Sequence, residues 1–205
     1  MNRASALFLV LLGIIAMLAF YQAFFPLPTS TSFIRFFGLS GFFLLCITLI
    51  IGPLSVLWPK AYAVLIEPRR ATGIAAFVFI LAHFLLVLIT VFGFNLAFIF
   101  SDHSNITAFL AFLILIALTI TSNDFSIRAL GAGNWKNVQR LTYIVFVLSF
   151  AHFLLKVNGL AIQNIRGITV YNLAQLGLIA LGIITILLQL AGFYVRIKRK
   201  ASAPA

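Results

Sequence analysis

The stretch AVLIEPRRATGIAAFVFILAHFLLVLIT, residues 63–90, decides the class of protein to which the chain belongs. From Ala71 to Thr90 it contains no Asp, Glu, Lys or Arg, and almost every side chain is apolar. An apolar helix of about 20 residues crosses the hydrocarbon core of a bilayer, which is about 30 Å thick. We therefore expect a membrane-spanning helix here, with one imidazole, that of His83, inside the bilayer.

The composition extends this interpretation to the whole chain. Hydrophobic residues make up 63% of the 205 residues and charged residues only 8%. A water-soluble domain could not cover its surface with so few polar groups. The pattern predicts an all-α polytopic membrane protein whose six transmembrane helices lie at about 5–25, 36–58, 72–98, 106–122, 138–157 and 173–195. Since no polar linker divides the chain, residues 1–205 are expected to form a single domain.

The first predicted span is interpreted as a membrane anchor that begins just after Arg3. A cleaved signal peptide is the alternative, but the apolar core is longer than usual for one and no Ala-x-Ala cleavage site follows. The single cysteine, Cys46, excludes an intramolecular disulfide and any cysteine-based cluster.

The basic residues predict the orientation of the helices. Of the 14 Lys and Arg residues, eleven fall on one side of the six-span arrangement and three on the other, 14 − 11 = 3. The eleven are Arg3, Lys60, Arg69, Arg70, Arg128, Lys136, Arg140, Arg196, Lys198, Arg199 and Lys200, and the three are Arg35, Lys156 and Arg166. Cytoplasmic loops carry the excess of basic residues, so both termini are expected in the cytoplasm. Because these residues flank apolar runs, the net charge of +11 does not indicate nucleic-acid binding.

A second histidine repeats the pattern of the first. His152 lies in RLTYIVFVLSFAHFLLK, residues 140–156, and both histidines stand in the tripeptide Ala-His-Phe. Each follows a cytoplasmic arginine, Arg70 or Arg140, by a similar interval, which corresponds to about 18–20 Å at 1.5 Å per residue. The third and fifth spans run in the same direction, so the two imidazoles are expected at equal depth, facing each other across one ligand.

Two facing imidazoles suggest one haem iron with two histidine ligands, a centre that passes electrons and has no open position for a substrate. A structural role is the alternative, because an intramembrane histidine can hydrogen-bond a neighbouring helix. A bare transition-metal ion is a poorer fit without carboxylate or thiolate ligands. All three acidic residues, Glu67, Asp102 and Asp124, fall in predicted loops, which disfavours a proton-relay transporter.

Four motifs, taken in order, resemble a known family. They are IGPL at 51–54, RRATGIAAFVFILAH at 69–83, LTITS at 118–122 and ALGAGNWKNVQRLTY at 129–143, followed by His152. Together they resemble the ferric-reductase-like transmembrane domain family, and within it the haem-binding membrane subunits of bacterial methionine sulfoxide reductase systems. The resemblance covers about residues 36–157.

The resemblance implies a b-type haem cytochrome subunit of the bacterial inner membrane, with His83 and His152 as the iron ligands. Electrons would come from a cytoplasmic flavin or NAD(P)H reductase, or from quinol, and would pass to an outer-side acceptor protein or to ferric iron. Gln139 stands where the family has a further histidine, so one haem is expected. The chain has no GxGxxG fingerprint, so it needs a donor partner unless quinol serves as the donor, which leaves open whether it is an enzyme by itself. The alternative function is a haem-free membrane scaffold or transporter.

Three basic residues are candidate cofactor contacts. Lys156 and Arg166, on the outer side, are candidates for pairing with a haem propionate, and snorkelling at a span end is the alternative. Arg70, next to Arg69, is a candidate for holding the phosphate of FMN or a quinone headgroup. The positive-inside rule explains both arginines equally well.

Overall fold

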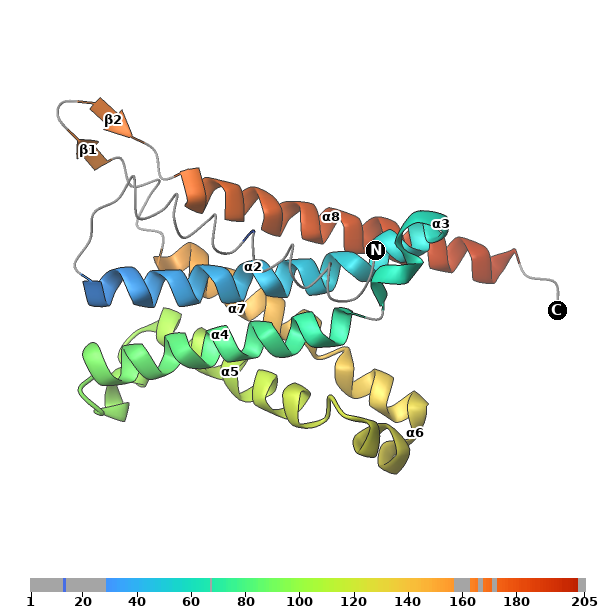
Figure 1. Cartoon of the computed structure of the whole chain (residues 1–205), viewed down its shortest axis with the longest axis horizontal. Helices are drawn as coiled ribbons and strands as arrows, with labels where there is room; N and C mark the ends of the chain where they lie inside the picture. The colour runs from blue at the N-terminus through green and yellow to red at the C-terminus, as the bar shows by residue number, and fades with distance from the viewer. Residues whose placement is uncertain are drawn as a thin grey trace.

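A computed structural model describes residue 13 and residues 29–66, 68–156, 163–165, 168–170 and 173–202. These residues form a bundle of helices with one short hairpin (Figure 1). The helices are α2 Thr29–Leu57, α3 Pro59–Tyr62, η1 Ala63–Ile66, α4 Arg69–Thr90, η2 Leu96–Phe100, α5 His103–Ile120, α6 Asp124–Gln139, α7 Thr142–Lys156 and α8 Leu173–Ala201. The hairpin strands, β1 Gln163–Ile165 and β2 Ile168–Val170, are antiparallel. The predicted all-α class is confirmed.

Five helical segments are long and apolar enough to cross a membrane, among the residues that the structure describes. They are Ser30–Leu57, Arg69–Thr90, His103–Ile120, Asp124–Lys156 and Gln175–Ala201, and each contains or overlaps one of the predicted spans. The predicted first span, 5–25, lies outside the described residues except for Gly13. The number of six spans therefore stays a prediction.

The predicted end of the third span, at residue 98, is wrong because the helix ends at Thr90. Gly93 and Phe94 have positive φ angles of 55° and 63°, a left-handed conformation that a helix cannot continue. The Phe94 N–H donates to the Leu88 carbonyl at 2.9 Å, which satisfies one of the last carbonyls of α4.

The connection between the fourth and fifth predicted spans is largely helical, because α6 occupies it. The Asn123 side chain caps this helix by accepting a hydrogen bond from the Ser126 N–H at 2.8 Å. Gly131 then breaks the helical geometry with φ 74° and ψ 148°. Gly131 thus forms a kink between the two helical parts of α6.

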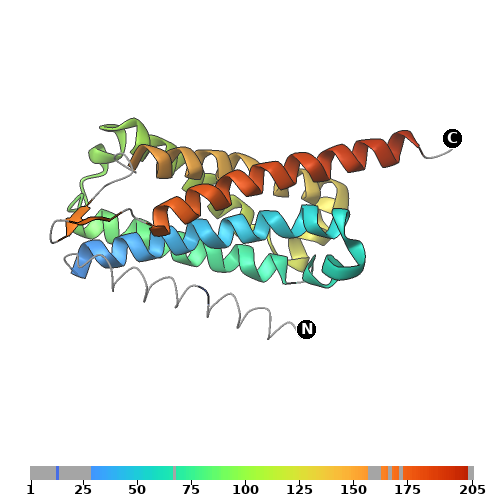
Figure 2. The ribbon, with the colours of Figure 1, turned by 90° about the horizontal axis from the view of Figure 1, so that it is seen from above.

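The bundle is built from two sets of helices. Helix α2 packs between α4 and α8, while α5 packs against α7 (Figures 1 and 2). The ring of Phe42 on α2 stacks on the α7 rings of Phe146, Phe150 and Phe153 at centroid distances of 5.9, 5.7 and 5.4 Å. This aromatic contact joins the two sets across the core.

Pro53 leaves one carbonyl of α2 without a hydrogen-bond donor, and α8 supplies one. Proline has no N–H, so the carbonyl of Leu49, four residues earlier, has no helical donor. The Gln189 side chain of α8 donates its Nε2–H to that carbonyl at 2.6 Å. Gly192, one turn further along α8, lets the helices approach, because an added Cβ would come within 3.1 Å of the Pro53 Cα. Pro53 and the carbonyl that it leaves free thereby help to fix where α8 crosses α2.

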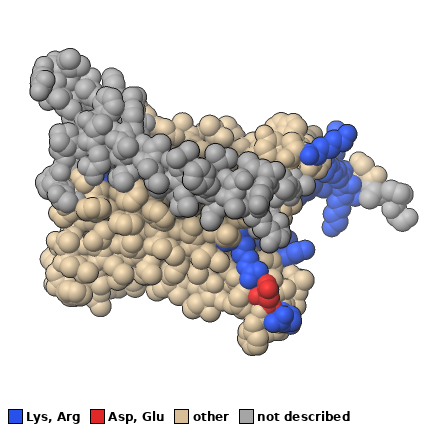
Figure 3. Space-filling model, in the orientation of Figure 1, with Lys and Arg blue, Asp and Glu red and all other residues tan. Residues whose placement is uncertain are grey.

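Basic side chains gather at one end of the bundle. On the face shown in Figure 3, Lys and Arg cluster at the end from which the C-terminus emerges. Arg199 on α8 donates to the Val56 carbonyl near the end of α2 at 3.1 Å, and Arg69, at the start of α4, donates to the Thr48 carbonyl at 3.0 Å. Helices α4 and α7 both begin at this end and run the same way (Figure 1).

We predict that Gln189→Leu destabilises the protein through the Leu49 carbonyl. An interhelical hydrogen bond inside a membrane protein contributes about 0.6–1.7 kcal/mol. A loss of this size is expected in the unfolding free energy measured in detergent micelles. In a Pro53→Ala background the restored backbone N–H satisfies the carbonyl, so the same substitution should have little effect. An equal loss in both backgrounds would contradict this explanation.

Candidate cofactor site

A cavity of about 510 Å³ lies between α2, α4, α5 and α7, toward the end of the bundle opposite the basic cluster. This volume is in the range of pockets that bind small molecules and cofactors. Its walls are mainly apolar and aromatic, with Phe84 and Phe112 stacked at 4.5 Å along one side. The polar side chains that line it are Arg35, His83, Asn105, Ser149, His152, Lys156 and Gln175.

His83 enters the cavity from α4 and is fixed by α2. Its Nδ1 lies 2.9 Å from the carbonyl of Ile34. A carbonyl can only accept, so Nδ1 carries the proton and Nε2 keeps its lone pair. Gly38 makes the contact possible, because a Cβ at this position would meet Nδ1 at 2.9 Å and Cε1 at 3.0 Å. Helix α2 therefore orients the ring and selects its tautomer.

His152 enters from α7 and is fixed by the first turn of α5. Its Nδ1 lies 2.8 Å from the carbonyl of Ser104 and 2.9 Å from the hydroxyl oxygen of the same residue. The carbonyl contact again requires the proton on Nδ1. The Ser104 hydroxyl accepts from Nδ1 and can turn its own hydrogen toward the His152 carbonyl, 3.5 Å away. Nε2 of His152 therefore also keeps its lone pair.

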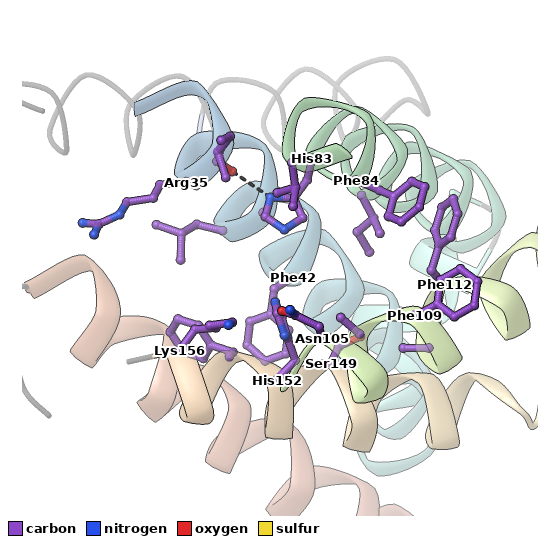
Figure 4. A pocket seen from close by; sticks show the side chains of 18 of the residues that line it. Arg35, Phe42, His83, Phe84, Asn105, Phe109, Phe112, Ser149, His152 and Lys156 are labelled. Atoms are coloured by element: carbon purple, nitrogen blue, oxygen red, sulfur yellow. Dashed lines mark hydrogen bonds between the residues drawn. The ribbon is translucent and has the colours of Figure 1, made fainter. Parts of the chain in front are cut away.

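The two rings lie on opposite sides of the same space (Figure 4). Their centroids are 6.4 Å apart and their planes are inclined by 66°. An imidazole nitrogen binds a first-row metal at about 2.0–2.1 Å and lies about 1.1 Å from its ring centre, so a linear nitrogen–metal–nitrogen arrangement needs about 6.3 Å between centroids. The spacing leaves room for one metal atom between the rings.

The pair has too few protein ligands for a bare ion. Within the part of the chain that the structure describes, no group of three or more His, Cys, Asp or Glu side chains comes together. A haem brings four nitrogen ligands of its own and needs only axial ligands from the protein. The two histidines and the apolar walls therefore fit a haem better than an isolated metal ion.

Lys156 lines the mouth of the cavity, four residues after His152. Its ammonium donates to Asp102 Oδ2 at 2.6 Å, while Asp102 Oδ1 accepts from the Ser104 N–H at 3.1 Å. The hydrogen bond from Lys156, followed by that from Ser104, holds the pKa of the Asp102 carboxyl below its usual value. Asp102 and Ser104 on one side therefore face Lys156 and His152 on the other, and they tie α5 to α7 at two neighbouring points.

The other candidates lie elsewhere. Arg70 is not part of the cavity: its guanidinium donates to Asp124 Oδ1 at 2.7 Å and to the Ser122 carbonyl at 2.8 Å. Its role toward a flavin phosphate or quinone stays a prediction. Arg166 lies outside the described residues, whereas Arg35, which was not among the predicted contacts, lines the cavity.

Gln139 lies at the other end of α5, at the end of α6. Its side-chain Nε2 lies 3.3 Å from the Leu118 carbonyl, 3.2 Å from the Thr121 hydroxyl and 3.4 Å from the Ser122 hydroxyl. Trp135 donates to the Thr121 carbonyl at 2.9 Å beside it. The amide therefore closes the end of α5 and is already engaged by protein groups.

A family model described as the ferric reductase like transmembrane component matches residues 37–150. The chain belongs to this family. The match contains α4, α5 and α6 and most of α2 and α7, and it includes His83 but ends two residues before His152. The predicted family resemblance is thus confirmed.

Two curated relatives carry the name protein-methionine-sulfoxide reductase heme-binding subunit MsrQ. The one from Agrobacterium fabrum is 34% identical over 125 residues, which cover 59% of this chain and 56% of the relative. The one from Brucella ovis is 34% identical over 136 residues, which cover 64% of this chain and 60% of the relative. The chain therefore matches somewhat more than half the length of these relatives. No solved structure matches it.

Sequence reasoning named both histidines but missed the groups that orient them. The Ile34 carbonyl is a backbone atom, and no residue type announces it. Gly38 and Gly41 carried a signal, since small residues three or four apart on a membrane helix allow close packing. An added Cβ at Gly41 would come within 2.6 Å of Ile80 Cγ1. The role of Ser104 was not predicted, because Ser104 follows Asp102 in a segment that looks like an ordinary helix N-cap.

We predict that Gly38→Ala lowers stability by forcing the His83 ring away from α2. Overpacking of a filled site typically costs about 1–3 kcal/mol. The matched control is Gly177→Ala on α8, where an added Cβ meets nothing within 4 Å. Thermal unfolding in detergent should show a lower midpoint for Gly38→Ala and an unchanged or higher one for Gly177→Ala. Equal midpoints for both variants would mean that the Gly38 contact is not tight in the protein.

Proposed function

We propose that the chain is a haem-binding subunit of a membrane electron-transfer system, with one haem held between His83 and His152. The observation that carries the proposal is that both rings have a protonated Nδ1 and an Nε2 that keeps its lone pair. Each Nδ1 is used up by a protein acceptor, and both rings border one cavity at a centroid spacing of 6.4 Å. The names of the MsrQ relatives, which describe them as heme-binding, support the same ligand.

Each part of the cavity has a task in this proposal. The His83 and His152 Nε2 atoms bind the iron, and the phenylalanines around them exclude water. Lys156 and Arg35, at the outer end, offer positive charge to the propionate groups. With Cys46 as the single cysteine, attachment through a pair of cysteines is ruled out, which agrees with the non-covalently bound b-type haem that the family resemblance implies. When bound, such a haem supplies one-electron transfer without an open position for substrate.

The surroundings of Gln139 support one haem per chain. Its amide is engaged by α5, and glutamine is not a usual iron ligand. The space between α2, α5 and α7 on the basic side of the cavity is filled by the buried side chains of Leu45, Leu49, Leu118 and Val145. These contacts support a single cofactor, located on the outer half of the bundle.

The position of the cavity also supports a direction of transfer. The basic end is cytoplasmic by the positive-inside rule, so the cavity lies toward the outer face. Electrons enter from a cytoplasmic flavin or NAD(P)H reductase or from membrane quinol, and leave to an outer-side acceptor protein or ferric iron. Since the sequence contains no GxGxxG nucleotide-binding fingerprint, a donor partner is required unless quinol is the donor.

The test of the function is the absorbance spectrum of the purified protein, oxidised and dithionite-reduced. We expect His83→Ala and His152→Ala each to abolish the low-spin spectrum with two imidazole ligands, because either change leaves one ligand in place of two. His103→Ala is the control, since this exposed residue at the start of α5 does not line the cavity. All three variants should insert into the membrane.

Two outcomes would count against the proposal. A wild-type protein that purifies without haem from cells with a sufficient haem supply would favour the haem-free scaffold or transporter. An unchanged spectrum in both His83→Ala and His152→Ala would show that the haem is bound elsewhere. A pyridine haemochrome assay that gives two haems per chain would contradict the single site.

The proposed orientation has its own test. Because the basic residues cluster at the end where α8 finishes, a reporter fused to the C-terminus should be active in the cytoplasm. A reporter fused after Ser101, in the turn before α5, should be active on the outer side. An exported C-terminal reporter would reverse the orientation and, with it, the proposed direction of electron flow.

A further inference from the structure

The two imidazoles are held by unequal sets of acceptors. The Nδ1–H of His83 meets one acceptor, the Ile34 carbonyl at 2.9 Å. The Nδ1–H of His152 meets two, both from Ser104: the carbonyl oxygen at 2.8 Å and the hydroxyl oxygen at 2.9 Å. Because the difference between the two sites is the Ser104 hydroxyl, this group has a role that ring orientation alone does not require.

The Ser104 carbonyl is a shared acceptor and is weakened by its other partners. The Thr107 hydroxyl donates to it at 2.8 Å. Within an α-helix the N–H four residues later also points at it. A carbonyl oxygen has two lone pairs, so three donors compete for them. The His152 N–H therefore shares its hydrogen bond between this carbonyl and the hydroxyl oxygen of Ser104.

The hydroxyl cannot be replaced by water. Ser104 is 2% exposed, and the first turn of α5 packs against α7 around it. Hydrogen bonds in such a dry environment are stronger than in water, and a lost one is not recovered from solvent. Any effect of the hydroxyl on the imidazole should therefore be visible when it is removed.

We infer that Ser104 is a positioning residue that sets the electron-donating strength of His152 and thereby lowers the reduction potential of the centre. The inference rests on the proposed function. An acceptor on Nδ1–H pulls the proton away from the ring and makes Nε2 a more basic ligand. A more basic ligand favours the oxidised metal over the reduced metal. Of the two axial ligands, His152 is then the stronger donor, because two acceptors hold its proton.

The experiment is a stepwise reduction of the haem-loaded protein at controlled potential, followed by absorbance. We expect Ser104→Ala to raise the reduced-to-oxidised ratio at a fixed potential about threefold, which corresponds to about 28 mV at 59 mV per tenfold change. Ser104→Thr keeps the hydroxyl and should restore the wild-type potential. Ser101→Ala is the matched control, because its hydroxyl donates to the Phe98 carbonyl and does not touch His152.

Thr107→Val tests the same inference, because it should shift the reduction potential in the opposite direction from Ser104→Ala. It removes a competing donor from the Ser104 carbonyl, so the His152 N–H is held more strongly and the potential should fall. A purely structural role for either residue would not move the potential in opposite directions. If Ser104→Ala does not retain haem, the Thr107→Val result decides.

The outcomes separate the two proposals. A wild-type protein that binds no haem would contradict the proposed function. A wild-type protein that binds haem, with Ser104→Ala at the wild-type potential or Thr107→Val unshifted or shifted upward, overturns the inference about Ser104 and leaves the function standing. Opposite shifts in the two variants, with Ser101→Ala unchanged, support it.

Discussion

A polar atom in the middle of a bilayer must find its partner within the protein, because no water is there to supply one. The structure meets this requirement with a few contacts between helices, and these contacts decide how the helices are arranged. Pro53 leaves the Leu49 carbonyl without its helical donor, and Gln189 of α8 supplies the missing hydrogen. The Nδ1–H groups of His83 and His152 need acceptors, and α2 and α5 supply them. Each of these hydrogen bonds joins two helices at a fixed depth.

The same requirement selects the chemistry of the imidazoles. A neutral histidine has one N–H, and the partner of that N–H determines which nitrogen is left as a ligand. Since both partners include a backbone carbonyl, both rings are driven to the same tautomer. The arrangement needs close contact between helices, which Gly38 allows on α2. The packing of the bundle and the tautomers of His83 and His152 therefore depend on the same contacts.

The sequence was sufficient to predict the parts of the structure that depend on hydrophobic length. The apolar runs predicted the membrane-crossing helices among the described residues, and the intervals from Arg70 and Arg140 predicted that His83 and His152 would lie at similar depth. Helix ends were predicted less well, since α4 is followed by a left-handed conformation at Gly93 and Phe94, and a phenylalanine gives no sequence signal for it. Helix α6 was not predicted, because it lies in the connection between two apolar spans and has no long apolar run of its own.

The backbone acceptors of the two histidines, the Ile34 and Ser104 carbonyls, could not be predicted from residue types. Which carbonyl faces which ring depends on the rotation and crossing of α2 against α4 and of α5 against α7. Gln139 is an intermediate case. Its departure from the family pattern was visible in the sequence, but its contacts with the end of α5 became apparent only with the helices in place.

The two histidines are held by different pairs of helices. His83 is seated on the α2–α4 pair, where Gly38 and Gly41 bring the helices together, whereas His152 moves with α5, to which α7 is fastened at Ser104 and again at Asp102. The spacing of the two rings therefore depends on how the α2–α4 pair packs against the α5–α7 pair. Aromatic side chains make this packing: Phe42 on α2 stacks on rings of α7, and Phe84, the neighbour of His83, stacks on Phe109 and Phe112 of α5.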